Sequence, residues 1–299
     1  MDNSLEEIIR RNSQPLTPLP TDCHPVLKPL AGIKAVLFDV YGTLFISSSG
    51  DVGTSSESGR ATAFADALAA VGICYRGTAA EGAARLIELI SREHTRMRDA
   101  GVDAPEIEIR EVWARTLRSL FDDGLIDIDN TDEVRLSELA VQYETRMNPV
   151  WPMPGLRDCL QRLRESGRQL GLISNAQFFT PMLFRVFLDQ TPQELGLKFS
   201  FLSYESRRAK PGRLLYDAAR ETLAQPSTAI SASEVLYLGN DMLNDVYPAS
   251  LVGFRTALFA GDARSLRLRP DDERIAGVVP DLVLTDLSQL DHCLTPSGV

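Results

Sequence analysis

The sequence is poor in cysteine and histidine. Its 299 residues include four cysteines and three histidines, and no two cysteines form a Cys-x-x-Cys pair. The chain therefore lacks the ligand spacing that a structural zinc site requires. Cys74 and Cys159 lie in apolar segments far apart in the sequence, so we expect free thiols in a reducing compartment rather than disulfides.

Long apolar runs and an excess of positive charge are also absent. No apolar run approaches the roughly 20 residues that span a bilayer, and Met1–Arg11 lacks the apolar stretch of a secretory signal. The formal net charge is −10, and an acidic surface repels the phosphate backbone of nucleic acids. We therefore expect a cytoplasmic protein with neither a membrane nor a nucleic-acid partner. No heptad run occurs, which leaves the oligomeric state open.

Short apolar runs that end in polar or glycine residues recur along the chain and are typical of buried parallel strands. The clearest is Lys34–Asp39, and the others are Gln169–Ser174, Phe199–Ser203, Val235–Gly239, Phe254–Phe259 and Leu282–Leu284. Helical patterns separate them, at Pro154–Ser166, Pro211–Leu223 and Asn244–Leu251. This alternation predicts an α/β fold with a doubly wound, Rossmann-like parallel sheet, in which ligands bind beyond the carboxyl ends of the strands.

The stretch between residues 60 and 148 contains no convincing strand. Its patterns are helical, at Ala61–Val71, Ala79–Arg98, Ile107–Phe121 and Asp132–Met147. We predict an α/β core formed by residues 31–47 and 149–299, interrupted by an all-helical domain at 48–148. Residues 1–30 are predicted as a short helix and a proline-rich lead-in, which either lies along the core or is mobile.

Polar residues follow two of the predicted strands. Asp39 ends the first run, and the turn that includes Gly42 and Thr43 can hold an anion beside it. Ser174 and Asn175 end the second run, where a hydroxyl can bind a phosphoryl or carboxylate oxygen. Simpler interpretations are a local turn for Asp39 and a helix N-cap for Ser174.

Two charged features lie farther along the chain. Lys210 precedes Pro211, and a lysine fixed in this way can neutralise a nucleophilic carboxylate and its substrate. Asp241 and Asp245 lie where the Val235–Gly239 run opens into a helix, so both can face one Mg²⁺ ion, which prefers oxygen ligands. The alternatives are a solvated surface lysine and a helix N-cap followed by a first-turn acid.

Taken in order, these features resemble the four motifs of the haloacid dehalogenase-like (HAD) superfamily: an aspartate, a serine or threonine, a lysine and an acidic pair. The matching segments are FDVYGTL, LISNA, AKPGRLLY and YLGNDMLND. The resemblance covers the core, about residues 31–46 and 151–290. The helical domain is similar to the C1-type cap of that superfamily.

The resemblance implies a hydrolase in which Asp39 attacks the substrate and forms a covalent intermediate that water then releases. Ser174 and Lys210 would complete the catalytic group. The implied substrate-binding residues are Tyr41, Gly42, Thr43 and Asn175. In phosphatases of the superfamily Mg²⁺ is the cofactor, and the ligands implied here are Asp39, the Tyr41 carbonyl, Asp241 and Asp245.

Tyr41 departs from the phosphatase pattern, which has a second aspartate two residues after the nucleophile. That aspartate protonates the leaving group, whereas a tyrosine with a pKa near 10 is a poor base at neutral pH. The DxYGT form resembles the 2-haloacid dehalogenases, which use no metal and displace halide at carbon. Those enzymes need an arginine for the substrate carboxylate, and the candidates in the helical domain are Arg92, Arg96, Arg98, Arg115 and Arg118.

The acidic loop, Gly239–Asp245, favours a phosphatase, because the dehalogenases lack a metal-binding acid in this loop. We therefore expect a Mg²⁺-dependent phosphatase that acts on a small phosphorylated metabolite through an aspartyl-phosphate on Asp39. Two alternatives stay open: a metal-independent 2-haloacid dehalogenase, and a weakly active or non-catalytic protein that binds a phosphorylated ligand.

Overall fold

The computed structural model describes residues 2–48, 57–127 and 132–294. Its centre is a six-stranded, fully parallel sheet with the strand order β5-β4-β1-β6-β7-β8. The strands are β1 (Ala35–Phe38), β4 (Gln169–Ser174), β5 (Leu197–Leu202), β6 (Val235–Gly239), β7 (Arg255–Phe259) and β8 (Leu282–Leu284). The predicted α/β fold with a Rossmann-like parallel sheet is confirmed.

Helices cover both faces of the sheet because successive strand residues point to opposite sides. Val36, Phe38, Leu236 and Leu238 pack in one apolar cluster with α6 (Leu156–Glu165) and α7 (Thr180–Leu188). Ala35, Leu37, Val235 and Tyr237 pack on the other side with α9 (Leu214–Leu223) and α10 (Tyr247–Leu251). Burial on both faces explains why the central strands are continuous apolar runs.

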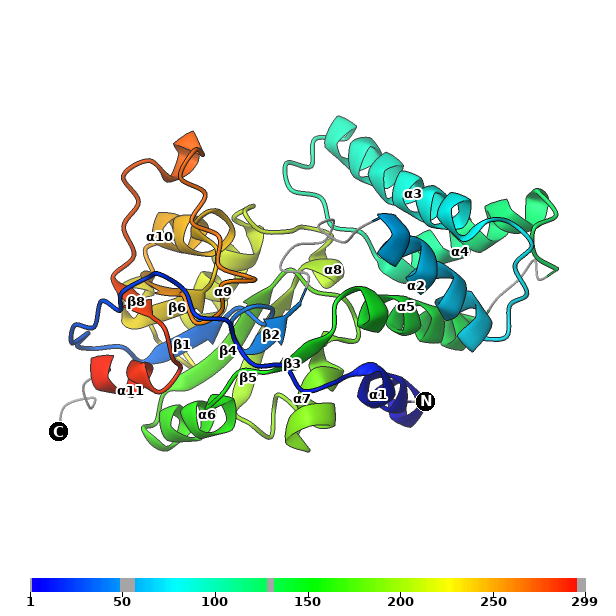
Figure 1. Cartoon of the computed structure of the whole chain (residues 1–299). Coiled ribbons are helices and arrows are strands. Elements are labelled where there is room, and N and C mark those ends of the chain that lie inside the picture. Colours follow the sequence, from blue (N-terminus) through cyan, green and yellow to red (C-terminus); the bar gives the residue numbers. More distant parts are fainter. Residues whose placement is uncertain (1, 49–56, 128–131, 295–299) are drawn as a thin grey trace.

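A helical insertion, residues 57–147, consists of α2 (Glu57–Ala70), α3 (Ala79–Asp99), α4 (Ile109–Asp122) and α5 (Glu133–Met147). Its helices lie together at one side of the sheet (Figure 1). They enclose an apolar cluster of their own, in which Phe64 stacks on the fully buried Trp113. A two-stranded antiparallel ribbon of β2 (Phe45–Ser47) and β3 (Val150–Pro152) joins the insertion to the core.

The N-terminal segment lies along the molecule, which decides between the two interpretations of residues 1–30. Helix α1 (Asp2–Asn12) runs beside α5 and α7 (Figure 1) and buries Leu5 and Ile9 in the main apolar cluster. Farther on, Val26 exchanges backbone hydrogen bonds of 2.9 and 3.1 Å with Val283 of β8. No helix in the described part of the chain is long and apolar enough to cross a membrane.

Candidate active site

The carboxyl ends of β1, β4 and β6 bring the sequence-predicted residues to one edge of the sheet. Asp39 directly follows β1, Ser174 ends β4, and Asp241 lies two residues beyond β6. Strands β4 and β6 are the two neighbours of β1 in the sheet. A parallel sheet collects all its carboxyl ends at one edge, so Asp39 lies between the other two segments.

Lys210 holds the centre of this edge. Its ammonium Nζ lies 2.7 Å from Asp39 Oδ1 and 2.6 Å from Asp245 Oδ1. All three side chains are buried, with 8% of Asp39, 3% of Lys210 and 1% of Asp245 exposed. The Tyr237 hydroxyl lies 3.2 Å from the same ammonium and 3.0 Å from Asp245 Oδ1. The lysine therefore neutralises part of the negative charge of both carboxylates.

Burial and charge act in opposite directions on Lys210. Loss of water alone would lower its pKa, but the adjacent carboxylates of Asp245 and Asp39 outweigh burial, and the net effect is a raised pKa. Burial also raises the pKa of Asp245, an effect that Lys210 opposes and the negative charge of Asp39 reinforces. The lysine is thus held as a cation between two acids.

Asn175 positions the main chain that carries Lys210. Its side-chain Oδ1 accepts a hydrogen bond of 2.7 Å from the Lys210 N–H, and its Nδ2 donates one of 3.2 Å to the Lys210 carbonyl. Both polar atoms of the amide are therefore used inside the protein. Asn175 therefore supports Lys210, and its predicted contact with a substrate stays a prediction.

The turn after Asp39 is tightly packed. Gly42 has a φ of +81°, and a Cβ there would lie within 2.8 Å of Ser265 and Asn240 atoms, so only glycine fits. The Thr43 hydroxyl donates to Asn240 Oδ1 at 3.1 Å. Ser174 is fully buried, and its hydroxyl makes one long contact, 3.4 Å to the Asn175 carbonyl. Of these groups, the Ser174 hydroxyl is the one most available to a substrate oxygen.

Tyr41 points its hydroxyl toward Thr180, with 2.9 Å between the two oxygens. Burial, followed by the negative charge of Glu144, raises the pKa of Tyr41 far above its usual value. A phenol with such a pKa neither gives up its proton readily nor serves as a base near pH 7. The residue that replaces the second aspartate therefore does not supply its acid–base chemistry.

Asp241 is fully engaged within the protein. Its Oδ1 accepts hydrogen bonds from the N–H groups of Leu243 (2.8 Å) and Asn244 (3.1 Å), which makes it the N-cap of a helical turn, Met242–Val246. Arg269 binds the same carboxylate with Nε at 3.1 Å from each oxygen and Nη2 at 2.6 Å from Oδ2. Asp241 is therefore a helix N-cap, one of the two interpretations that the sequence allowed.

The same contacts test whether Mg²⁺ fits. Asp245 Oδ2 accepts a hydrogen bond from the Asp241 N–H at 2.9 Å, and its Oδ1 binds Lys210. In the described residues no group of three or more histidine, cysteine, aspartate or glutamate side chains is arranged to hold a metal ion. Both oxygens of each acid of the last motif already have donors. In this arrangement the residues present do not fit Mg²⁺.

Residues 104–109 of the insertion pack beside the catalytic edge, that is, the candidate site at the carboxyl ends of β1, β4 and β6. The Ser203 hydroxyl donates to Glu106 Oε2 at 2.7 Å, and Gln177 Nε2 donates to the Ile107 carbonyl at 2.9 Å. Burial raises the pKa of Glu106. Gln177 lies three residues after Ser174, so this contact ties the insertion to the end of β4.

The arginines of the insertion that were considered for a substrate carboxylate mostly pair within the insertion. Arg92 pairs with Glu88, Arg118 with Asp122, and Arg96 and Arg115 both pair with Glu93. The structure instead reveals partners that the sequence did not single out: Tyr237, Thr180 and Arg269. Thr180 and Arg269 lie outside the four motif segments, and Tyr237 opens the segment YLGNDMLND, in which only the acids were predicted to act.

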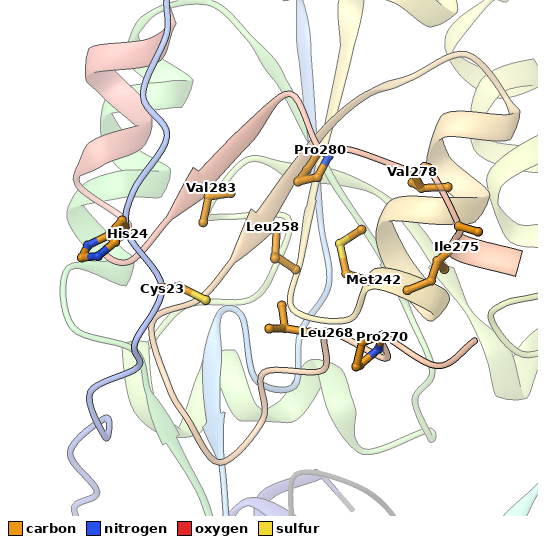
Figure 2. Close-up of a pocket in the computed structure, with 12 residues that line it drawn as sticks. Cys23, His24, Met242, Leu258, Leu268, Pro270, Ile275, Val278, Pro280 and Val283 are labelled. Carbon is orange, nitrogen blue, oxygen red and sulfur yellow. The ribbon is translucent and has the colours of Figure 1, made fainter. Parts of the chain in front are cut away.

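A separate pocket of about 480 Å³ is lined in part by Met242 of the acidic loop (Figure 2). Its lining is mainly apolar and includes Met242, Leu258, Leu268, Pro270, Ile275 and Val283. Met242 follows Asp241 in the sequence, while Leu268 and Pro270 flank Arg269. None of the catalytic candidates lines this pocket, so it is distinct from the edge that carries Asp39.

Comparisons with known proteins agree with this architecture. A family model described as haloacid dehalogenase-like hydrolase matches residues 33–253. A search of curated protein sequences finds no match. Among solved structures, a 2-haloacid dehalogenase from Pseudomonas syringae pv. Tomato DC3000 is 20% identical, with a TM-score of 0.54, over 87% of this chain and 97% of that chain.

A HAD phosphatase from Thermococcus onnurineus is 18% identical, with a TM-score of 0.50, over 86% of this chain and 96% of that chain. At such identities the two structures establish a shared fold and do not distinguish one reaction from the other. The family model, in contrast, spans most of the chain. The chain therefore belongs to the haloacid dehalogenase-like hydrolase family.

Proposed function

We propose that this protein is a hydrolase that forms a covalent ester on Asp39 and releases a leaving group that departs as an anion without receiving a proton. The observation that supports this proposal most directly is that the Tyr41 hydroxyl is hydrogen-bonded within the protein, to Thr180, and has a raised pKa, far above neutral. Without an acid at that position, a strongly basic leaving group would depart slowly.

Displacement of halide from a 2-haloacid is the form of this reaction that the site favours. An Asp39 oxygen would attack the carbon that bears the halogen, a C–O bond would form, and the halogen would leave with the bonding electron pair as halide. Water would then hydrolyse the Asp39 ester, which releases a 2-hydroxy acid and a proton. The Lys210 ammonium, 2.7 Å from Asp39, would hold the carboxylate in place during both steps.

Hydrolysis of a small phosphorylated metabolite, the function predicted from the sequence, is the second candidate. The retained acids Asp241 and Asp245 support it. Mg²⁺ would screen phosphoryl charge if it bound, but both acids hold cationic side chains of this chain, so no step is derived through the metal. With Tyr41 as described, activated phosphates such as aryl esters would react much faster than alkyl phosphates.

The deciding experiment measures halide release from a panel of 2-haloacids in the presence of a chelator, and phosphate release from aryl and alkyl phosphates with and without Mg²⁺. We expect halide release that is independent of Mg²⁺ and absent in Asp39→Asn, with an ester adduct on Asp39 in the intact mass at short times. Phosphate release without halide release would select the second candidate. Ligand binding without either product would show a non-catalytic binding protein.

Tyr41→Asp tests the leaving-group argument directly. The new carboxyl group would stand where family phosphatases have their acid, so we expect turnover of alkyl phosphates to rise at least about tenfold. Tyr41→Phe is the matched control, because it removes only the hydroxyl and should leave that rate unchanged. A large loss of activity in Tyr41→Phe would show that the phenol takes part in the reaction.

A further inference from the structure

The loop between β7 and β8 is hydrogen-bonded to the acidic loop along residues 265–267. The Arg267 N–H donates to the Asn240 carbonyl at 3.0 Å, and the Met242 N–H donates to the Arg267 carbonyl at 2.9 Å. Asn240 Nδ2 also donates to the Ser265 carbonyl at 2.6 Å. These bonds hold both sides of Asp241 against residues 265–267, so the loop is fixed in register with the acidic loop.

Arg269 lies just beyond this paired stretch and turns its guanidinium onto Asp241. The Asp241 side chain is 8% exposed and that of Arg269 is 29% exposed, so the pair is largely removed from water. Arg269 has a φ of +51°, in the left-handed region that non-glycine residues rarely occupy. A planar guanidinium that binds both oxygens of a carboxylate combines charge with fixed geometry.

Each carboxylate at the edge of the sheet is paired with a cationic side chain of this chain, and one net negative charge remains. Three carboxylates, Asp39, Asp241 and Asp245, face two cations: Lys210 binds Asp39 and Asp245, and Arg269 binds Asp241. Mg²⁺ would need to bind an Asp241 oxygen at about 2.1 Å in near-octahedral geometry. That geometry is incompatible with donors of a guanidinium on both oxygens, and an arginine does not lose its charge near neutral pH.

We propose that Arg269 is a built-in cation that takes the place of a divalent metal at Asp241, so that this chain does not load Mg²⁺ at its catalytic edge. Arg269 acts as a positioning residue, because it contacts Asp241 and not the nucleophile. Removal of its charge would leave Asp241 Oδ2 with one neutral donor, Asn244 Nδ2 at 3.0 Å, beside the negative charges of Asp39 and Asp245. The acidic loop would then acquire the Mg²⁺ affinity that its two aspartates suggest.

The test is calorimetric titration of the full-length protein with MgCl₂, in the wild type, Arg269→Met and Asp241→Asn. We expect no saturable binding in the wild type up to the highest MgCl₂ concentration used. In Arg269→Met we expect saturable binding with a dissociation constant at least about tenfold below that concentration, and a rise of the melting temperature in Mg²⁺. Arg274→Met is the matched control, because Arg274 binds Asp272 through the same Nε and Nη2 atoms at an exposed position. It should bind no more Mg²⁺ than the wild type.

Saturable Mg²⁺ binding in the wild type that Asp241→Asn abolishes would overturn the proposal, whether or not Arg269→Met folds. The proposal would also be overturned if neither the wild type nor a folded Arg269→Met bound Mg²⁺. Arg269 would then not be the residue that excludes the metal. If the methionine variant does not fold, Arg269→Gln retains a polar side chain for the same comparison. Binding is measured without turnover, so its outcome is separate from that of the reaction proposed above.

Discussion

The catalytic edge and the helical insertion handle charge in opposite ways. At the edge, Asp39, Lys210 and Asp245 are buried and bonded to one another. In the insertion, pairs such as Arg92–Glu88 and Arg118–Asp122 are more than half exposed and surround an apolar cluster, and the buried acid Glu93 binds two arginines at the surface. Buried charges are costly to leave unpaired, whereas exposed pairs contribute little. Changes at the edge should therefore have large effects and those on the insertion small ones.

The largest effect is expected from Asp39→Asn. The amide is a far weaker nucleophile, so turnover of the substrate identified by the panel should fall at least about a thousandfold. Asn keeps the size of the side chain, and its carbonyl oxygen can still accept from Lys210, so the circular dichroism spectrum should not change. Asp122→Asn, at an exposed pair of the insertion, is the control and should keep full activity. Substantial activity in Asp39→Asn would refute Asp39 as the nucleophile.

The second-largest effect is expected from Lys210→Met, as a loss of stability. It leaves Asp39 and Asp245 buried without their cation, and removal of one partner of a buried ion pair costs about 3–5 kcal/mol. Urea unfolding measures this loss. Lys34→Met is the matched control in the same domain, because Lys34 pairs with Glu234 at the surface with 53% of its side chain exposed. That change should cost about 0–1 kcal/mol, and similar losses in both variants would contradict the contrast.

Two contacts of the insertion with the core, one buried and one exposed, allow a comparison in which the expected stability losses are smaller. Glu106→Ala removes the 2.7 Å acceptor of the Ser203 hydroxyl, which keeps only its 3.2 Å bond to the Ala176 carbonyl, and we expect a loss of about 1–3 kcal/mol. Glu111→Ala breaks the exposed pair with Arg207 at the same junction and should cost about 0–1 kcal/mol. Thermal unfolding and proteolysis of the insertion measure both. Equal losses would show that burial does not set the strength of the docking contacts.

The smallest effect concerns Glu144 of α5, whose charge acts on Tyr41. Burial raises its pKa from 4.5 to about 7. Stability from the protonated form is fully present below pH 4.5 and is lost as the pH rises through 7. Glu144→Gln stays neutral, so at pH 8 it should be more stable than the wild type by about 1–2 kcal/mol, given the partial exposure of the side chain.

The matched control for this prediction is Glu88→Gln, an exposed residue of α3. Its stability should follow that of the wild type at every pH. The measurement is the difference in unfolding free energy between each variant and the wild type at pH 5 and pH 8. A difference that does not change with pH for Glu144→Gln would show that its carboxyl group titrates in its ordinary range.

Much of the fold could be predicted because it depends on local patterns. Val235–Gly239 and Gln169–Ser174 are strands with the predicted bounds, since both faces of the sheet are covered and every residue of the two runs after Gln169 is apolar or small. The helices of the insertion follow three- and four-residue apolar spacing. The course of residues 13–30 was open from the sequence, because their hydrogen bonds join them to distant segments: residues 260–264, β8 and α11 (Gln289–Cys293).

The candidate site was predictable only in part. The sequence indicated that Asp39, Ser174 and Asp241 follow strands, and a parallel sheet brings such residues to one edge. It did not indicate that Asn175 holds Lys210, or that Thr180 holds Tyr41 across 139 positions. The acidic pair suggested Mg²⁺ because two free carboxylates would bind it. That prediction depends on whether other side chains reach the acids, which spacing does not show.

The sequence by itself determined that this is an α/β protein with a helical insertion and that its candidate site residues gather at the carboxyl ends of the strands. Periodicity and strand order are enough for that, because they act over a few residues at a time. Only the tertiary structure decided which charges meet: Lys210 with Asp39 and Asp245, and Arg269 with Asp241. Electrostatic balance depends on distances of a few ångströms between distant segments, and those distances exist only after the chain has folded.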